Sequence, residues 1–302
     1  MEKALLSSII IGCGFVLALH SCDKPFVEDG AETPTGNEKS LKIRLNANKV
    51  EDVSFENESP TSRSVNELEE ACKRITLAIF DADNNKIKTV SETTSDKSFG
   101  HFDINISEGT YTIVVIAHNG TANPTISTPE EIKFANNKIT DTFYYCGDID
   151  VVDGQEYNIT LKRATAMFRL VVKDNTPSAV KQMKFYYTGG SSTLNAMTGY
   201  GCVNSKQTEY REIKSSAYNG DSEYEVYTFP HEGDKKLKFE ISALSGTSST
   251  STPLYTRIIE DVQMRRNTIS QYSGYFYGET PEGGRGFDIR IGDEWQIENY
   301  EY

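Results

Sequence analysis

Short runs in which apolar and polar residues alternate place the tightest limit on the folds open to this chain, because they recur along most of its length. In the first run, Leu41, Ile43 and Leu45 alternate with polar residues. The same period of two returns near residues 75–79, 102–106, 157–161 and 237–241. This period places alternate side chains on opposite faces of a β-strand. Many such runs, separated by turn residues, predict an all-β fold of antiparallel sandwiches or barrels.

The chain is long enough, at 302 residues, for two domains of ordinary size. A turn at Asp153-Gly154 leads into a strand that ends near Leu161, and the next apolar run starts at Ala164. We therefore expect two β-sandwiches, at residues 40–162 and 163–302. The two halves show no strong internal sequence repeat.

The first 21 residues have the layout of a secretory signal peptide. Lys3 precedes a mostly apolar run over residues 4–19, and the small residue Ser21 follows it. Serines and glycines interrupt the run, which is also short of the roughly 20 apolar residues that a membrane-spanning helix needs. The sequence therefore predicts a signal peptide at residues 1–21, with cleavage before Cys22.

Residues 19–22, Leu-His-Ser-Cys, resemble the lipobox of bacterial lipoproteins, where lipid is attached to the cysteine after cleavage. The resemblance implies that Cys22 is lipidated. The alternative is an ordinary signal peptide followed by a coincidental cysteine. Two or more acyl chains would make the attachment effectively permanent. The polar stretch 22–39, which contains prolines and glycines, is expected to be a flexible lipidated linker.

The composition and motifs argue against nucleic-acid binding and against catalysis. Acidic residues outnumber basic ones by 44 to 31, for a net charge of −13, whereas phosphates require basic neutralisation. His101, His118 and His231 form no recognisable nucleophile or metal motif. Residues 148–154 resemble a calcium loop, but their spacing is wrong by one residue and the closing glutamate is missing. We expect no enzyme activity, no metal and no cofactor.

The cysteines that follow Cys22 are Cys72, Cys146 and Cys202. An odd number leaves at least one of them unpaired in an oxidising compartment. We expect buried free thiols, because Cys72 and Cys146 lie beside strand-like runs. One disulfide remains the alternative.

Four stretches look like the fimbrillin superfamily. They are residues 74–81, 109–119, 161–170 and 261–276. The resemblance implies two tandem transthyretin-like antiparallel β-sandwiches with Greek-key connections. It also implies a surface-exposed lipoprotein of the cell outer membrane that builds type V pili with other fimbrial subunits. Stalk subunit, tip subunit and basal anchor all remain open as roles.

The resemblance also draws attention to Arg63. In this superfamily, stalk subunits are cut after an arginine in an exposed loop, which removes the first strand, whereas anchors stay uncut and keep their lipid. Arg63 lies in the polar segment 60–64, and a cut there would release the strand at residues 41–45. The alternative is an arginine in a solvated loop.

The C-terminal segment is a candidate donor strand, which we place at residues 286–297. A glycine-rich hinge at residues 280–286 precedes Phe287, Ile289 and Ile291, which alternate with polar residues. Alternate apolar residues can fill pockets while the backbone pairs with an open sheet edge. The alternative is the last strand of the chain's own sandwich.

Two functions therefore remain. The leading hypothesis is a non-catalytic fimbrial lipoprotein, an anchor or a pilus subunit, that assembles by β-strand addition and contributes to cell adhesion. The alternative is a surface lipoprotein that binds glycans. The chain has a single tryptophan, Trp295, which disfavours an aromatic platform for binding sugars. The tyrosines that could serve instead are Tyr186, Tyr187, Tyr272 and Tyr275.

Overall fold

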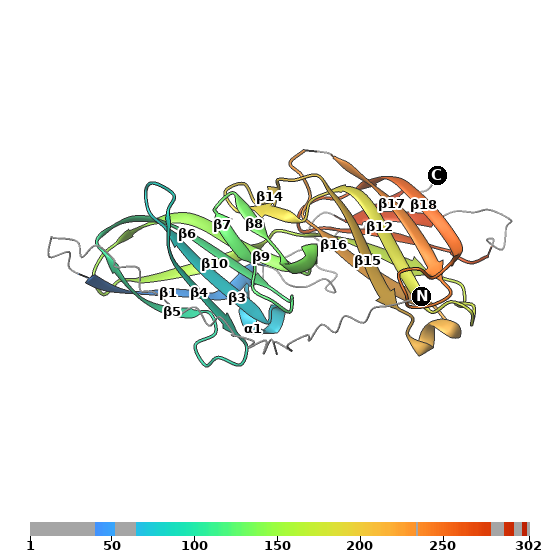
Figure 1. Ribbon diagram of the computed structural model, residues 1–302, viewed down its shortest axis with the longest axis horizontal. Coiled ribbons are helices and arrows are strands. Elements are labelled where there is room, and N and C mark those ends of the chain that lie inside the picture. The colour runs from blue at the N-terminus through green and yellow to red at the C-terminus, as the bar shows by residue number, and fades with distance from the viewer. Residues whose placement is uncertain (1–39, 52–64, 234, 279–286, 293–297, 301–302) are drawn as a thin grey trace, which may run out of the picture. The chain divides into compact units, whose positions relative to one another are not determined.

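The chain folds predominantly into β-sheets, which confirms the predicted class (Figure 1). The computed structural model describes residues 40–51, 65–233, 235–278, 287–292 and 298–300. Its helical elements are α1 (Leu68–Ala71) and the 3-10 turns η1 (Ala135–Asn137) and η2 (Ser215–Tyr218). Within these residues, no helix has the length and apolar character needed to cross a membrane.

The N-terminal strands form one sheet that bends at β10. Its strands are β1 (Ser40–Glu51), β2 (Val65–Glu67), β3 (Arg74–Phe80), β4 (Lys86–Thr93), β5 (His101–Ser107), β6 (Gly109–His118), β9 (Thr142–Val151) and β10 (Glu156–Arg163). One arm has the order β5-β1-β10, and the other has the order β9-β6-β3-β4. The first part of β10 pairs with β1, whereas Lys162 and Arg163 pair with β9.

The two arms of this sheet pack against each other. Leu41, Ile43 and Leu45 of β1 share one buried cluster with Leu77 of β3 and Val115 of β6. Because β1 and β3 belong to different arms, the cluster is the core between them. Burial of such apolar surface is the main term that stabilises a sheet pair.

The C-terminal strands form two further sheets around a second core. One sheet holds β16 (Ser222–Thr228), β11 (Ala166–Val172), β19 (Ile269–Gly274), β20 (Phe287–Gly292) and β21 (Glu298–Tyr300), in that order. The other holds β15 (Ser205–Glu212), β12 (Gln182–Gly190), β17 (Lys236–Leu244) and β18 (Pro253–Gln263), which lie side by side in Figure 1. Phe168 stacks on Phe239 across this core, with ring centroids 4.1 Å apart.

A fourth, small sheet joins strands from both halves of the sequence. It contains β7 (Thr125–Thr128), β8 (Glu131–Lys133), β13 (Thr193–Asn195) and β14 (Tyr200–Gly201). The pair Leu194 and Ile132 connects β13 to β8. A third cluster lies beside it and contains Phe80, Val114 and Ile116, which face away from the first core. Strands β3 and β6 are therefore buried on both faces.

The two halves repeat one strand arrangement, although their sequences show no strong repeat. In the first half, β1 lies between β5, antiparallel, and β10, parallel. In the second half, β11 lies between β16, antiparallel, and β19, parallel. The expectation of purely antiparallel pairing is wrong for these two pairs. Each parallel pair joins the first strand of its half to a strand much later in the chain, so a long connection separates the two.

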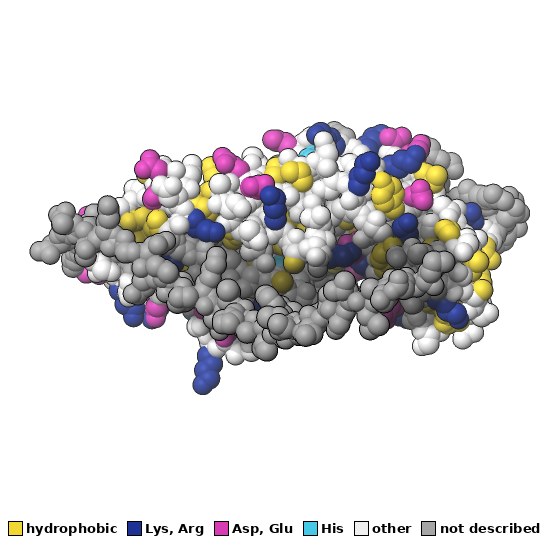
Figure 2. All heavy atoms as spheres, in the orientation of Figure 1, with side chains coloured by type: hydrophobic (Ala, Val, Ile, Leu, Met, Phe, Trp, Pro, Cys, Tyr) yellow, Lys and Arg dark blue, Asp and Glu magenta, His cyan; other side chains and the backbone are white. Residues whose placement is uncertain are grey.

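Charges of both signs are spread over the face shown in Figure 2, where acidic and basic side chains lie among one another. Such a surface suits a protein exposed to solvent.

Candidate functional site

Strand β1 occupies the position that the superfamily resemblance singles out. It is an interior strand, held by antiparallel pairing with β5 from Ser40↔Ser107 to Asn46↔His101. On its other side it pairs in parallel with β10, from Arg44↔Glu156 to Val50↔Leu161. We call the space that β1 fills between β5 and β10 the β1 slot. If β1 left, both neighbouring strands would expose unpaired main-chain groups.

The inward side chains of β1 are deeply buried. They are Leu41, Ile43, Leu45, Ala47 and Val50, each 4% exposed or less. The alternation correctly predicted Leu41, Ile43 and Leu45 on this face, as it did Phe102, Ile104 and Ile106 of β5. Vacating the β1 slot would therefore open a line of apolar pockets, which is the shape that another alternating strand can fill.

Polar contacts secure the outer face of β1. The guanidinium of Arg44 donates to Asp103 of β5, with a separation of 2.9 Å between Nε and Oδ1. This contact lowers the pKa of Asp103 and raises that of Arg44. The Asn46 amide donates to Asn158, at 3.0 Å, and to Glu156, both on β10. The Arg44–Asp103 pair is solvent-exposed, so it orients β1 more than it stabilises it, whereas Asn46 is buried.

The segment that follows β1 contains the predicted cleavage position. After Glu51 the described chain resumes at Val65, and β2 pairs back onto β1 from Lys49↔Glu67 to Glu51↔Val65. Arg63 lies between these points, outside the described residues, as do Cys22 and the linker at residues 22–39. Cleavage at Arg63 and lipidation at Cys22 therefore stay predictions.

The predicted donor strand lies at the margin of the C-terminal sheet. Strand β20 pairs antiparallel with β19, with Phe287, Ile289 and Ile291 opposite Gly274, Tyr272 and Ser270. Strand β21 then pairs with β20. This is the arrangement expected of a last strand in its own sheet. Whether β20 is also lent to another subunit stays a prediction, and the hinge at residues 280–286 lies outside the described residues.

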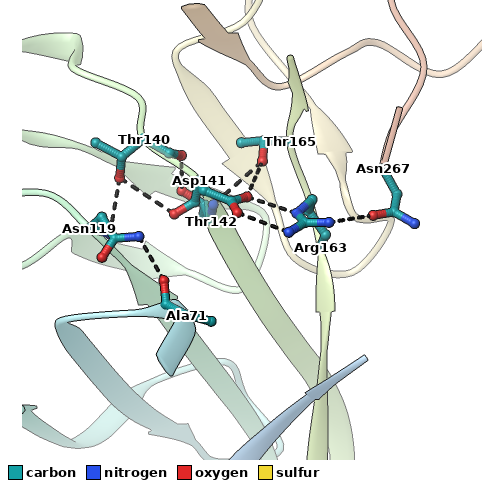
Figure 3. A network of polar contacts seen from close by, with 8 residues as sticks. All are labelled: Ala71, Asn119, Thr140, Asp141, Thr142, Arg163, Thr165 and Asn267. Carbon is teal, nitrogen blue, oxygen red and sulfur yellow. Dashed lines mark hydrogen bonds and ion pairs between the residues drawn. The ribbon is translucent and has the colours of Figure 1, made fainter. Parts of the chain in front are cut away.

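A buried polar network joins the loops where the two halves of the chain meet (Figure 3). Arg163 ends β10, and its guanidinium donates to both carboxylate oxygens of Asp141, at 2.9 and 3.0 Å. Thr165 donates to the same carboxylate at 3.0 Å, and Arg163 also donates to Asn267 at 2.9 Å. The guanidinium stacks on Phe143, 4.8 Å from the ring centroid. Sequence reasoning missed this network, because its members are far apart in the chain and follow no motif.

A second contact at this junction involves Arg266. Its guanidinium donates to the hydroxyl of Tyr144 on β9, at 2.9 Å, and lies 4.7 Å from the ring centroid of Tyr200 on β14. Cation–π contacts of this kind add to the ordinary packing. The Arg163 and Arg266 contacts tie β9 and β10 to the loops before β19.

The remaining predicted features take ordinary structural positions. The segment 148–154 forms the end of β9 and a turn, as expected from Asp153-Gly154. No group of three or more His, Cys, Asp or Glu side chains that could hold a metal ion occurs in the described part of the chain. Cys72, Cys146 and Cys202 are free thiols, and only Cys72 is buried.

The tyrosines considered for a glycan platform are only partly available. Tyr187 is 0% exposed and Tyr272 is 3% exposed, because the strand alternation turns both into the second core. Their expected exposure is therefore wrong. Tyr186 and Tyr275 are half-buried.

The family model for fimbrillin-A associated anchor proteins Mfa1 and Mfa2 matches residues 40–301. The chain belongs to this family. Residue 40 is also where β1 begins, so the family match includes the occupied β1 slot. No curated protein matches the chain.

Solved structures that match this chain with TM-scores of 0.5 or more share its fold at low sequence identity. A candidate adhesin from Bacteroides thetaiotaomicron has a TM-score of 0.52 at 9% identity, covering 86% of this chain and 97% of that one. A candidate polysaccharide-binding protein from the same organism has a TM-score of 0.50 at 11% identity, covering 87% and 99%. The fimbrial anchor protein Mfa2 from Porphyromonas gingivalis has a TM-score of 0.43 at 13% identity, covering 87% and 100%.

Proposed function

We propose that this chain is a non-catalytic lipoprotein that anchors a fimbrium to the outer membrane and contacts other fimbrial subunits by β-strand addition. The occupied β1 slot carries the proposal, because an interior strand with a line of buried apolar residues is the element that strand addition exchanges. Membership of the anchor family supports the same role. The two packed sheet pairs fit tandem transthyretin-like sandwiches with a boundary at residues 162 and 163.

The order of features along the chain separates the anchored state from a processed one. Cys22 and β1 both precede Arg63. A cut after Arg63 would therefore sever the lipid and β1 from the rest of the chain together. An anchor must keep residue 63 intact, and its β1 slot then stays filled. We propose that the anchored form is the uncut one.

The C-terminal strand supplies the other half of this proposal. Strand β20 connects to the rest of the sheet through β19, over six residue pairs. Its other edge pairs with the short strand β21, over three residue pairs. A strand at the margin of a sheet can pair with another chain, and the same element can be exchanged between chains. We propose that Phe287, Ile289 and Ile291 enter the open slot of a neighbouring processed subunit.

The lipid and processing claims are tested by intact mass and N-terminal mapping of the cell-surface form. A lipidated chain that starts at Cys22 is expected. An Arg63→Ala variant should start at the same residue with the same acylation and differ in mass only by the arginine-to-alanine change. Cys22→Ala should abolish acylation and membrane attachment. A wild-type chain that starts at Ser64, or an unacylated Cys22, would overturn the anchor proposal.

The donor-strand claim needs a separate test. Ile289→Asp is compared with Asp288→Asn, which changes a neighbouring position of the same strand. Co-purification of fimbrial subunits with the lipidated chain should be lost in Ile289→Asp and kept in Asp288→Asn. Equal recovery of subunits with both variants, and with a chain truncated after Gly286, would refute the donor role.

A further inference from the structure

Strands β9 and β10 separate after a short stretch of pairing. They are joined only at Lys162↔Tyr144 and Arg163↔Phe143 among the described pairs. Beyond these, β9 continues along β6 and β10 continues along β1, so the two strands diverge. A groove of about 490 Å³ lies between them. We call this space the β9–β10 opening.

The side of β10 that faces the opening carries main-chain groups without a described strand partner along residues 156–161. The Arg44 N–H donates to the Gln155 carbonyl at 3.0 Å, so Gln155 directs its main chain toward β1. Successive residues of a strand direct their N–H and C=O groups to opposite sides of the strand. Glu156 and Asn158 therefore direct their N–H and C=O groups away from β1, into the opening.

The repeated strand arrangement shows what such an edge accepts. Strand β19 is the counterpart of β10, because each is the parallel neighbour of the first strand of its half. The outer side of β19 carries β20, in antiparallel register over six residue pairs. The outer side of β10 is the corresponding edge in the first half, and no described strand covers it along residues 156–161. An added antiparallel strand would make the two halves alike.

The lining of the opening indicates the chemistry of that strand. Buried Ile149 and Ile159 form its apolar floor, and Val152, which is 55% exposed, extends it at the turn. Asp148 and Glu156 are solvent-exposed at its rim.

The residues that line the opening include no lysine or arginine. Asp150 also lines it and is held by a hydrogen bond from Thr110 to its carboxylate, at 2.6 Å. The Tyr157 hydroxyl donates to the Asp150 carbonyl, so a side chain rather than a ladder connects the strands there. Three carboxylates around an apolar floor favour a strand with apolar residues alternating with basic ones.

We propose that the edge of β10 at residues 156–161 binds an extended segment of a partner subunit, as an antiparallel strand with alternating apolar and basic residues. The inference rests on the proposed anchor function and specifies where a partner can be received. Since β1 fills its slot in the uncut chain, the β1 slot cannot receive a partner there. The β9–β10 opening supplies an edge that is free while the lipid is still attached.

The binding test uses a seven-residue blocked peptide of alternating lysine and valine, with an alternating glutamate and valine peptide as the control. The lysine peptide should bind the full mature chain, and its affinity should fall as salt is added. Binding should protect the amides of Glu156 and Asn158 from hydrogen exchange. Equal binding of both peptides, or protection that spares residues 156–161, would overturn the inference.

A pair of variants separates the backbone from the side chain. Asn158→Pro removes the N–H that faces the opening, a change that an edge position tolerates. Asn158→Ala removes the same side-chain contacts with Asn46 but keeps the N–H. We expect affinity for the lysine peptide to fall about tenfold or more in Asn158→Pro and to stay near wild type in Asn158→Ala. The reason is that main-chain hydrogen bonds to the edge of β10 hold the bound peptide. Equal affinities in two folded variants would contradict the proposal.

The same variants distinguish this inference from the anchor function itself. If the lipidated wild-type chain fails to co-purify with fimbrial subunits, the proposed function fails. If the wild type and Asn158→Pro recover subunits equally well, the anchor function stands and only the β10 edge is refuted.

Discussion

The guanidinium of Arg163 donates to both carboxylate oxygens of Asp141, and neither group has much access to solvent. The side chains are 2% and 11% exposed. Arg163 ends the strand at which the first sheet bends, and Asp141 precedes β9. The pair therefore fixes the point where β9 and β10 begin to diverge. It holds closed one end of the β9–β10 opening.

Arg163→Leu should destabilise the protein strongly, because among the described residues it leaves Thr165 as the one donor to the buried Asp141 carboxylate. Removal of one member of a buried ion pair typically costs about 3–5 kcal/mol. The free energy of unfolding, measured in urea, should fall by roughly this amount. The double variant Arg163→Leu with Asp141→Leu should recover much of the loss. A single variant as stable as the wild type would show that the pair contributes little.

His118 should make the protein less stable in mild acid. The side chain is 2% exposed, its Nδ1 accepts the Gly120 N–H at 3.1 Å, and its Nε2 has no described partner. Burial, together with the positive charge of Arg74, lowers its pKa from 6.5 to about 4. The folded protein therefore keeps the ring neutral at pH values where the unfolded chain protonates it.

Between pH 6.5 and about 4 the unfolded state binds more protons, so stability falls as the pH falls through this window. The whole shift corresponds to about 3 kcal/mol. His118→Phe keeps a ring against Phe134, whose centroid lies 5.3 Å away, but cannot be protonated. Unfolding curves in urea at several pH values should show a flatter profile for this variant. An unchanged slope would assign the acid sensitivity to other groups.

The sequence predicted strands with one solvent-exposed face better than strands that are buried on both faces. Strand β5 shows the expected alternation, with Phe102, Ile104 and Ile106 buried. In β3, every residue after Arg74 is buried, because the third cluster covers its second face. The period of two at residues 75–79 correctly placed Ile75, Leu77 and Ile79 on one face, which belongs to the first core. It did not reveal that the opposite face, with Ala78 and Phe80, is buried as well.

Features that depend on distant pairing were beyond the reach of local patterns. The pair of β1 with β10 is parallel and joins Arg44 to Glu156, and no spacing rule predicts such a partner. The small sheet that links β8 to β13 contains strands of two to four residues, too short for a period to appear. The position of the first strand was correctly predicted, whereas its neighbours, and hence the β1 slot and the β9–β10 opening, needed the structure.

Truncation of an inward residue of β1 should weaken the occupied slot. Leu45 is 0% exposed, so Leu45→Ala leaves a cavity and should lower the free energy of unfolding by about 2–5 kcal/mol. Lys42→Ala alters the exposed face of the same strand and should change it by no more than about 0.5 kcal/mol. Urea titrations of the uncut chain measure both changes in the free energy of unfolding. Similar losses in the two variants would mean that β1 is not held by its apolar face.

The three thiols should react with a maleimide in a fixed order under native conditions. Cys202 is exposed, Cys146 is partly buried and Cys72 is 1% exposed. Burial raises the pKa of Cys146 to about 11 and that of Cys72 well above its usual value. Because the thiolate is the reactive form, Cys202 should be labelled first and Cys72 last. Peptide mapping by mass spectrometry gives the order, and early labelling of Cys72 would contradict the buried position.

A side chain at Gly199 should destabilise the protein, because this residue lies where Arg266 and Tyr144 meet. Its φ is +75°, and an added Cβ would collide with the Tyr144 hydroxyl and with the Arg266 guanidinium. Gly154 is a matched control, since its φ is +74° but an added Cβ there would meet nothing within 4 Å. Gly154→Ala should therefore cost only the backbone strain of about 1 kcal/mol.

In Gly199→Ala the free energy of unfolding should fall by the same backbone strain. It should fall by roughly a further 1–3 kcal/mol because the Arg266 contact with Tyr144 is displaced. Thermal unfolding of the two variants in parallel measures the difference, and hydrogen exchange of β9 and β14 shows where it arises. Faster exchange confined to these strands is expected for Gly199→Ala. If the two alanine variants are equally stable, Arg266 does not hold the junction between the halves in the way the contacts indicate.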